Sequence, residues 1–172
     1  MDKKNKSNKK LHTKTLSFKN DDIDLLEFYE FNRKKYPFLL ESSAKGNKRA
    51  RFSILFSNPK IVLEKKKDDN FNFLEKFDEL WKKERININN DKGLPFIGGW
   101  FIYLGYELVS EIENKLNLPK SNFMIPDAFA ARVKSAIIKD QLKKKLYFVS
   151  DSSFGNIDDM FEDYKIIFKK KN

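Results

Sequence analysis

The chain has 172 residues, carries a formal charge of +10 and is 40% hydrophobic, with 17 Phe among its apolar side chains. This supply of large apolar residues is enough for the core of one domain and excludes a wholly disordered chain. The absence of Cys excludes a disulfide scaffold and thiolate chemistry. The single His, His12, lies in a polar segment near the N-terminus, which argues against Ser–His catalysis, and carboxylates are the main metal ligands that the chain can offer.

The positive charge lies mainly at the two ends of the chain. Residues 1–20 contain seven Lys and one Asp, and residues 169–171 are all Lys, whereas residues 21–168 are almost neutral. Lys is also far more frequent than Arg, as in proteins of AT-rich genomes, so we expect no binding to nucleic acid. No apolar run is long enough to span a membrane, and the basic N-terminus lacks the apolar segment of a secretory signal. We therefore expect a cytoplasmic protein that does not bind membranes.

The first part of the chain predicts a tail, a domain boundary and a helix. Residues 1–12 are charged and of low complexity, and we expect residues 1–15 to form a disordered basic tail. Residues 16–172 are expected to form a single domain. Apolar positions between residues 23 and 31 predict its first helix, with Asp21 or Asp22 as the cap.

Short apolar runs and amphipathic spacings predict the remaining elements. The predicted strands cover residues 38–42, 51–56, 60–64, 98–106, 128–140 and 145–150. The predicted helices cover residues 73–81 with Asn70 as the cap, residues 107–114, and a segment from Asn156 or Asp158 to Phe168. Because no strand–helix–strand alternation recurs, the fold class is α+β with a mainly antiparallel sheet.

Two sets of residues are candidate ligand sites. Gly98 and Gly99 lack the other residues of a phosphate loop or dinucleotide fingerprint, so we interpret them as a sheet bend or a close approach of the backbone to a bulky group. Glu107 and Glu111 are spaced to share a helix face, with Glu113 nearby. Without a histidine beside them, a solvated acidic face is favoured over a metal site. We expect no cofactor in this chain.

Glu41 is less usual, because it directly follows a short apolar run at residues 38–40. A carboxylate near the core at the end of a strand needs a partner. Two partners remain open: Arg51, across a predicted hairpin, and a bound ligand. The ion pair with Arg51 is the favoured alternative.

Three blocks of sequence follow one another along the chain: YPFLLES at residues 36–42 with RFSIL at 51–55 and NP at 58–59, LPFIGGW at 94–100 with YLGYEL at 103–108, and PD at 126–127 followed by two strands. In this order they resemble the N-terminal domain of the chorismate-utilising synthases, which are component I of anthranilate synthase and of aminodeoxychorismate (para-aminobenzoate) synthase. The resemblance covers roughly residues 30–150, and Ile102 stands where the family often has Gly. It implies a sandwich-like, mainly antiparallel sheet with flanking helices.

The resemblance implies a non-catalytic domain of aminodeoxychorismate synthase component I. That enzyme converts chorismate and glutamine-derived ammonia to 4-amino-4-deoxychorismate, on the route to 4-aminobenzoate and folate. Gly99–Trp100 and residues 105–108 favour this branch. The alternatives are the same domain of anthranilate synthase component I, in tryptophan biosynthesis, and a free-standing regulatory or interaction module.

The family's glutamate-rich magnesium motifs and basic chorismate-binding segments do not occur in this sequence. The resemblance therefore implies that the catalytic chorismate-binding domain is absent, that this chain holds no catalytic residue and is inactive alone, and that Mg²⁺ belongs to the missing domain. Its implied partners are that catalytic domain, in cis or in trans, and a glutamine amidotransferase subunit. A lone half of such an enzyme is also expected to expose apolar surface around residues 98–106.

The resemblance further implies a pocket for an effector such as tryptophan, formed by Leu40, Glu41, Ser42 and Arg51. Glu41 would accept a hydrogen bond from the ligand's ammonium group or balance a nearby cation. Ser42 would bond to the polar end of the ligand, and Leu40 would contribute to the wall around its ring.

Overall fold

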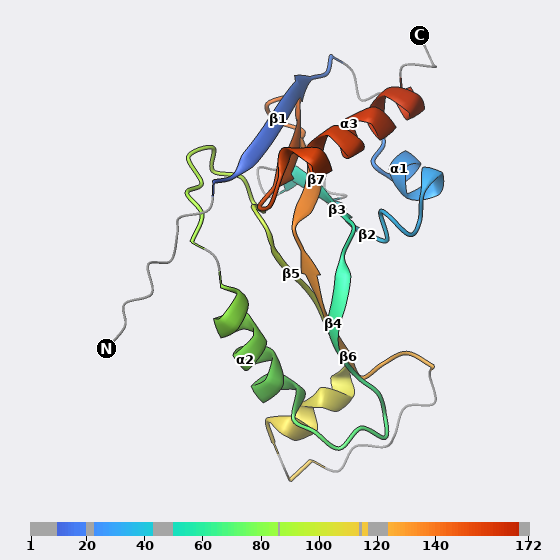
Figure 1. The fold of residues 1–172 in the computed structure, drawn as a ribbon. Coiled ribbons are helices and arrows are strands. Elements are labelled where there is room, and N and C mark those ends of the chain that lie inside the picture. The colour runs from blue at the N-terminus through green and yellow to red at the C-terminus, as the bar shows by residue number, and fades with distance from the viewer. Residues whose placement is uncertain are drawn as a thin grey trace, which may run out of the picture. The chain divides into compact units, whose positions relative to one another are not determined.

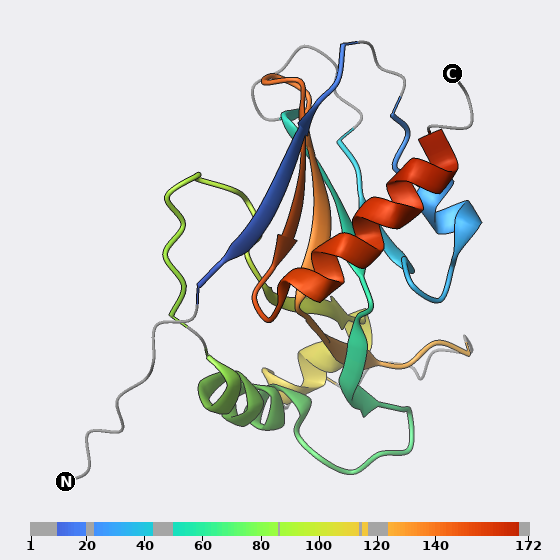
Figure 2. The same cartoon turned by 45° about the horizontal axis from the view of Figure 1, so that its top comes forward.

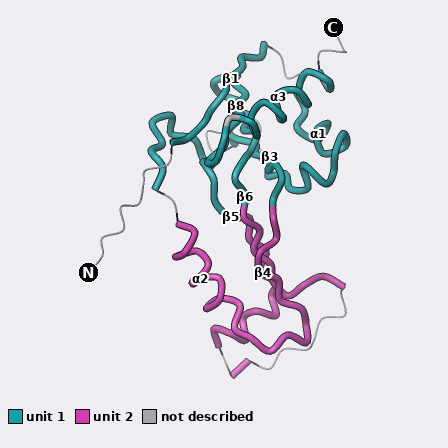
Figure 3. The backbone as a smooth tube through the Cα atoms, viewed as in Figure 1, with its two compact units in different colours: residues 1–59, 86–99, 133–172 teal, residues 60–85, 100–132 magenta. Residues whose placement is uncertain are grey.

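The computed structural model is shown in Figure 1, and Figure 3 shows the two compact units into which the chain divides. Unit 1 comprises residues 1–59, 86–99 and 133–172, and unit 2 comprises residues 60–85 and 100–132. The structure describes residues 10–19, 23–42, 50–85, 87–113, 115–116 and 124–168.

Unit 1 is built on a five-stranded antiparallel sheet. Its strands, in spatial order, are β1 (His12–Ser17), β8 (Lys145–Ser150), β7 (Ser135–Asp140), β3 (Phe52–Ser57) and β2 (Phe38–Leu40). Two hairpins, β7–β8 and β2–β3, are joined through the β3–β7 pair, in which Phe52 lies opposite Asp140. The hairpin between β7 and β8 turns through Lys144, which has a positive φ of 51°.

Helices α1 (Leu26–Phe31) and α3 (Phe154–Phe168) complete unit 1. Figure 2 shows α3 crossing one face of the sheet. Its residues Ile157 and Met160 are fully buried, and the Phe161 ring meets the Phe148 ring of β8 edge to face at 5.6 Å. Burial of these aromatic and aliphatic side chains holds the helix on the sheet.

Unit 2 contains a three-stranded sheet in the order β4 (Lys60–Lys65), β6 (Ala128–Val133), β5 (Gly99–Leu104). The helix α2 (Phe73–Glu84) and the 3₁₀ helix η2 (Tyr106–Glu111) belong to the same unit. Their apolar side chains form a second core with the small residues of β6. This core comprises Phe73, Leu108, Ala128 and Ala130, with Leu63, Phe71, Leu74, Phe77 and Trp100 packed against it.

The structure confirms the α+β class and the antiparallel pairing. It corrects the tail predicted at residues 1–15, because residues from His12 onwards form β1. Residues 10–11 are described without regular structure, and residues 1–9 lie outside the described residues. Pairing with the distant β8 makes this strand, with His12 opposite Ser150 and Ser17 opposite Lys145. A low-complexity composition carries no information about such a long-range partner.

Four predicted boundaries also change. The strand predicted at residues 128–140 is two strands, β6 and β7, because the chain leaves one sheet at Val133 and enters the other at Ser135. Helix α2 is capped by Asn72 rather than Asn70, and α3 begins at Phe154. The helix predicted at residues 107–114 is the shorter η2. None of the helices in the described part of the chain has the length and apolar composition that a bilayer crossing needs.

Candidate functional site

The segment that leads into β2 is anchored to α3 by polar contacts. The hydroxyl of Tyr36, whose ring is fully buried, donates to Asp163 Oδ2 at 2.6 Å, and Lys35 Nζ lies 2.6 Å from the same oxygen. Burial and the adjacent Asp163 carboxylate raise the pKa of Tyr36 far above its ordinary value, so the phenol remains a donor. The start of β2 therefore has a fixed position in unit 1.

Three of the predicted pocket residues follow one another at the end of β2. Leu39 packs against the core of unit 1, and the alternation of a strand directs Leu40 to the opposite face, where it is 50% exposed. Strand pairing ends where Leu40 lies opposite Ile54. Glu41 and Ser42 come directly after and are both exposed. The loop at residues 43–49 lies outside the described residues.

Arg51, the fourth predicted residue, is bound to a different carboxylate from the one expected. Its Nε donates to Asp140 Oδ1 at 3.0 Å and its Nη2 to Asp140 Oδ2 at 2.6 Å. The ion pair that we favoured between Glu41 and Arg51 is thus replaced by a bidentate pair with Asp140. The physical reason is the β3–β7 register, which places Phe52 opposite Asp140 and so brings the preceding residue, Arg51, to its side.

Asp140 organises the turn between β7 and β8. Its Oδ1 also accepts hydrogen bonds from the backbone N–H groups of Leu142 and Lys143, and the N–H of Gln141 donates to the carbonyl of Arg51. Burial alone would raise the pKa of Asp140, but the bonds from Arg51 and the two N–H groups outweigh it and hold the pKa below its ordinary value. Asp140 has no signal in local sequence, because its partner Arg51 is 89 residues away.

The end of β2 therefore offers a carboxylate, a hydroxyl and an apolar side chain to solvent. A carboxylate can accept charge-assisted hydrogen bonds from an ammonium group, and a hydroxyl can donate or accept. These groups suit recognition of a small polar ligand rather than acid–base or nucleophilic chemistry. Among the described residues, no group of three or more His, Asp or Glu side chains is arranged to hold a metal ion.

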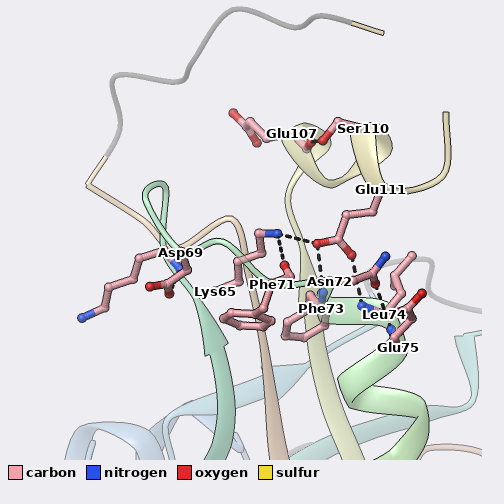
Figure 4. A network of polar contacts seen from close by, with 11 residues as sticks. Lys65, Asp69, Phe71, Asn72, Phe73, Leu74, Glu75, Glu107, Ser110 and Glu111 are labelled. Atoms are coloured by element: carbon pink, nitrogen blue, oxygen red, sulfur yellow. Dashed lines mark hydrogen bonds and ion pairs between the residues drawn. The ribbon is translucent and has the colours of Figure 1, made fainter. Parts of the chain in front are cut away.

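Glu111 differs from the solvated acidic residue that the sequence predicted. Its side chain is 8% exposed and accepts from Lys65 Nζ at 2.5 Å (Figure 4). It also accepts from the backbone N–H groups of Phe73 at 2.9 Å and Leu74 at 3.1 Å, at the start of α2. Glu107 is partly buried and Glu113 is exposed. The carboxylate of Glu111 is therefore a structural cap for α2.

The cap is completed by neighbouring groups. Asn72 Oδ1 accepts from the N–H of Glu75 at 2.9 Å, and Lys65 Nζ also donates to the carbonyl of Phe71 (Figure 4). Burial would raise the pKa of Glu111, but the bonds from Lys65, Phe73 and Leu74 together lower it. The donors at the N-terminus of α2 thus meet acceptors both from their own segment and from η2.

Gly98 has the structural role that we inferred for the glycine pair. Its φ of +108° is unfavourable for any side chain, and a Cβ atom at this position would lie 2.5 Å from Oδ2 of the buried Asp151. The backbone of Gly98 therefore passes directly against Asp151. The interpretation as a close approach to a bulky group is confirmed at Gly98.

Sequence comparisons relate the chain to one kind of enzyme. No protein-family model matches it. The chain is 30% identical over 145 residues to anthranilate synthase component 1 of Acetivibrio thermocellus, a match that covers 76% of this chain and 29% of that protein. It is 28% identical over 147 residues to anthranilate synthase component 1 of Lactococcus lactis, a match that covers 78% of this chain and 31% of that protein. The chain is homologous to a region of anthranilate synthase component I.

A comparison with solved structures supports the same fold. The crystal structure of anthranilate synthase component I from Streptococcus pneumoniae matches 84% of this chain and 35% of its own, with a TM-score of 0.55 and 19% sequence identity. At this identity the match shows a shared fold. The chain spans about a third or less of the length of each of these three proteins.

Proposed function

We propose that this chain is a non-catalytic N-terminal part of a chorismate-utilising synthase, which supports the catalytic region and contributes to an aromatic amino-acid pocket. The observation that carries the proposal is the 30% identity over 145 residues to the Acetivibrio thermocellus enzyme. The three sequence blocks at residues 36–59, 94–108 and 126–127 and the shared fold add support.

Each of the two enzyme branches has its own supporting observation. Both curated relatives and the solved structure carry the name anthranilate synthase, which favours a role in tryptophan biosynthesis. Gly99–Trp100 and the run from Gly105 to Leu108 favour aminodeoxychorismate synthase, on the route to 4-aminobenzoate and folate. Sequencing the genes that flank this coding segment tests the branch, because genes of one pathway are expected beside it.

The proposed partners follow from the share of the relatives that the chain covers. About two-thirds of each relative has no counterpart in this chain. We therefore propose that a chorismate-binding catalytic region, in cis or in trans, completes the enzyme, that Mg²⁺ binds to that region, and that a glutamine amidotransferase supplies ammonia.

We place the pocket at the end of β2. The exposed Glu41 would accept from the ammonium group of tryptophan, Ser42 would bond to the polar end, and Leu40 would contact the indole ring. Arg51 would act as a positioning residue, since its bidentate pair with Asp140 fixes the start of β3.

Isothermal titration of L-tryptophan into the full chain tests this pocket. We expect binding by the wild type and an affinity lowered by about ten- to a hundredfold in Glu41→Gln or Ser42→Ala, because each change removes one charge-assisted hydrogen bond. Glu79→Gln, which neutralises an exposed carboxylate of α2, is the matched control and should leave the affinity unchanged.

The outcomes separate the two parts of the proposal. Equal affinities in the wild type and both variants would remove Glu41 and Ser42 from the pocket. No heat of binding in the wild type would overturn the effector pocket in this chain, while the role as part of a synthase would still rest on the sequence comparisons.

A further inference from the structure

The strand register of unit 1 places Leu40 in a row of apolar side chains that crosses four strands. Leu40 lies opposite Ile54, Ile54 opposite Ile138, and Ile138 opposite Tyr147. Residues directly opposite one another in antiparallel strands direct their side chains to the same face of a sheet. Leu39, the neighbour of Leu40, packs against the core that contains residues of α3, so this row lies on the other face of the sheet.

The exposure of the side chains identifies the open end of this row. Ile138 is fully buried and Tyr147 is 7% exposed, whereas Leu40, on the edge strand β2, is 50% exposed and the adjacent Ile54 is half-buried. Proteins often place charged side chains on such an edge, but β2 has none. Apolar surface is therefore accessible where Leu40 and Ile54 meet, and we call these two side chains the β2–β3 patch.

The patch is bounded along β3 by aromatic side chains. Phe56, two residues after Ile54, is buried, and its ring meets the Phe96 ring edge to face at 5.0 Å. Phe52, two residues before Ile54, lies under the guanidinium group of Arg51, whose Cζ is 4.5 Å from the centroid of the ring. Alternate residues of a strand share a face, so the patch lies between two aromatic residues whose Cα atoms are about 13 Å apart.

The patch also adjoins the polar groups of the proposed pocket. Glu41 and Ser42 directly follow Leu40 in the chain, and both are exposed. Small-molecule sites are mostly apolar, with a few polar groups that fix the orientation of the ligand. An α-amino acid with an aromatic side chain matches this arrangement, because Glu41 can accept from its ammonium group while its ring covers the patch. A ligand without a large apolar group would leave the patch in water.

We infer that Ile54 is a specificity-determining residue of the proposed pocket and contacts the face of the ligand's ring. Leu40 lies at the edge of the ring, and Glu41 holds the ammonium group. An indole ring covers more of Ile54 than a phenyl ring does, so this contact favours tryptophan over phenylalanine. The inference rests on the proposed effector pocket and adds to it a residue on β3.

Isothermal titration of L-tryptophan and L-phenylalanine into the full chain tests the role of Ile54. We expect Ile54→Ala to lower the affinity for tryptophan by about tenfold or more and to reduce the preference for tryptophan, because the larger ring loses more contact. Ile54→Val keeps most of the contact and should have an intermediate affinity. Ile61→Ala, the same truncation at a residue that is 50% exposed on β4, is the control and should leave both affinities unchanged. An unchanged preference in Ile54→Ala would overturn the assignment.

Methyl NMR provides a second measurement, on the wild-type chain with ¹³C-labelled Ile δ1 methyl groups. The Ile54 resonance is the one that is missing from the spectrum of Ile54→Val. A ring lying on Ile54 should shift this resonance upfield when L-tryptophan is added, whereas the Ile61 resonance, assigned with Ile61→Val, should not move.

The outcomes separate this inference from the pocket on which it rests. Tryptophan binding that weakens in Glu41→Gln but leaves the Ile54 resonance in place would overturn the role of Ile54, while the pocket at Glu41 and Ser42 would stand. No binding of tryptophan by the wild type would overturn the pocket and, with it, the role of Ile54.

Discussion

At the scale of single residues, Asp140 shows how one buried carboxylate can join two distant segments of chain. It is 1% exposed and accepts from Arg51 before β3 and from two N–H groups in the β7–β8 turn. These are charge-assisted hydrogen bonds to a desolvated group, which contribute more to stability than neutral ones.

Asp140→Asn should lower the free energy of unfolding by about 1–3 kcal/mol, because the amide loses one of the two oxygens that bind Arg51. Urea unfolding followed by circular dichroism measures the change. The control is Asp158→Asn, which removes an exposed ion pair with Lys14 at 3.7 Å and should change stability by less than about 0.5 kcal/mol. Equal effects of the two substitutions would contradict a structural role for Asp140.

Gly98→Ala should destabilise the chain by about 2–4 kcal/mol, since Ala must adopt a φ of +108° and its Cβ would overlap Asp151. Thermal unfolding measures the loss. Gly155→Ala in α3 is the matched control: its Cβ would meet only Ser153 Oγ, at 3.8 Å, so stability should stay within about 1 kcal/mol of the wild type. A tolerated Gly98→Ala would show that the segment can relax away from Asp151.

At the scale of elements, α2 begins with a cap that comes partly from another segment. Its own Asn72 could have been predicted, since Asn directly before the first residue of an amphipathic run is a usual cap. The contribution of Glu111 could not have been predicted from local sequence, because it depends on η2 packing beside the start of α2. Glu111 also pairs with Lys65, so β4, α2 and η2 meet at one carboxylate.

Glu111→Gln should lower the free energy of unfolding by about 1–3 kcal/mol at pH 7. The pKa of Glu111 is lowered by folding, so its contribution is complete above the ordinary value of 4.5 and is lost as the pH falls through the lower pKa of the folded state. The difference in the free energy of unfolding between the wild type and Glu111→Gln should therefore become smaller at acid pH. Urea unfolding at neutral and acid pH measures this difference in the free energy of unfolding, with Glu79→Gln as the control. A difference that stays the same at both pH values would show that the charge of Glu111 is not involved.

At the scale of the whole molecule, the chain spans about a third or less of the proteins it matches. We predict that the purified chain shows no turnover of chorismate with ammonia and Mg²⁺, because the groups that bind substrate and metal are expected in the part of the relatives that this chain does not match. Product fluorescence and chromatography measure turnover. Activity that co-purifies with the chain from a host lacking both synthases would refute this prediction.

The sequence by itself determined the α+β class, most strands and the amphipathic helices. These depend on periodicity within one segment, as in α2, where apolar residues recur every three or four positions. It also placed Leu40, Glu41 and Ser42 together, because they are consecutive and follow a strand.

Only the tertiary structure decided which distant groups meet. Arg51 bonds to Asp140, 89 residues away, and not to Glu41. Glu111 is buried against Phe73, and His12 begins a strand because β8 lies beside it. Local pattern reports how one segment can fold, whereas the partner of a charge or of a strand edge depends on contacts between segments far apart in the chain.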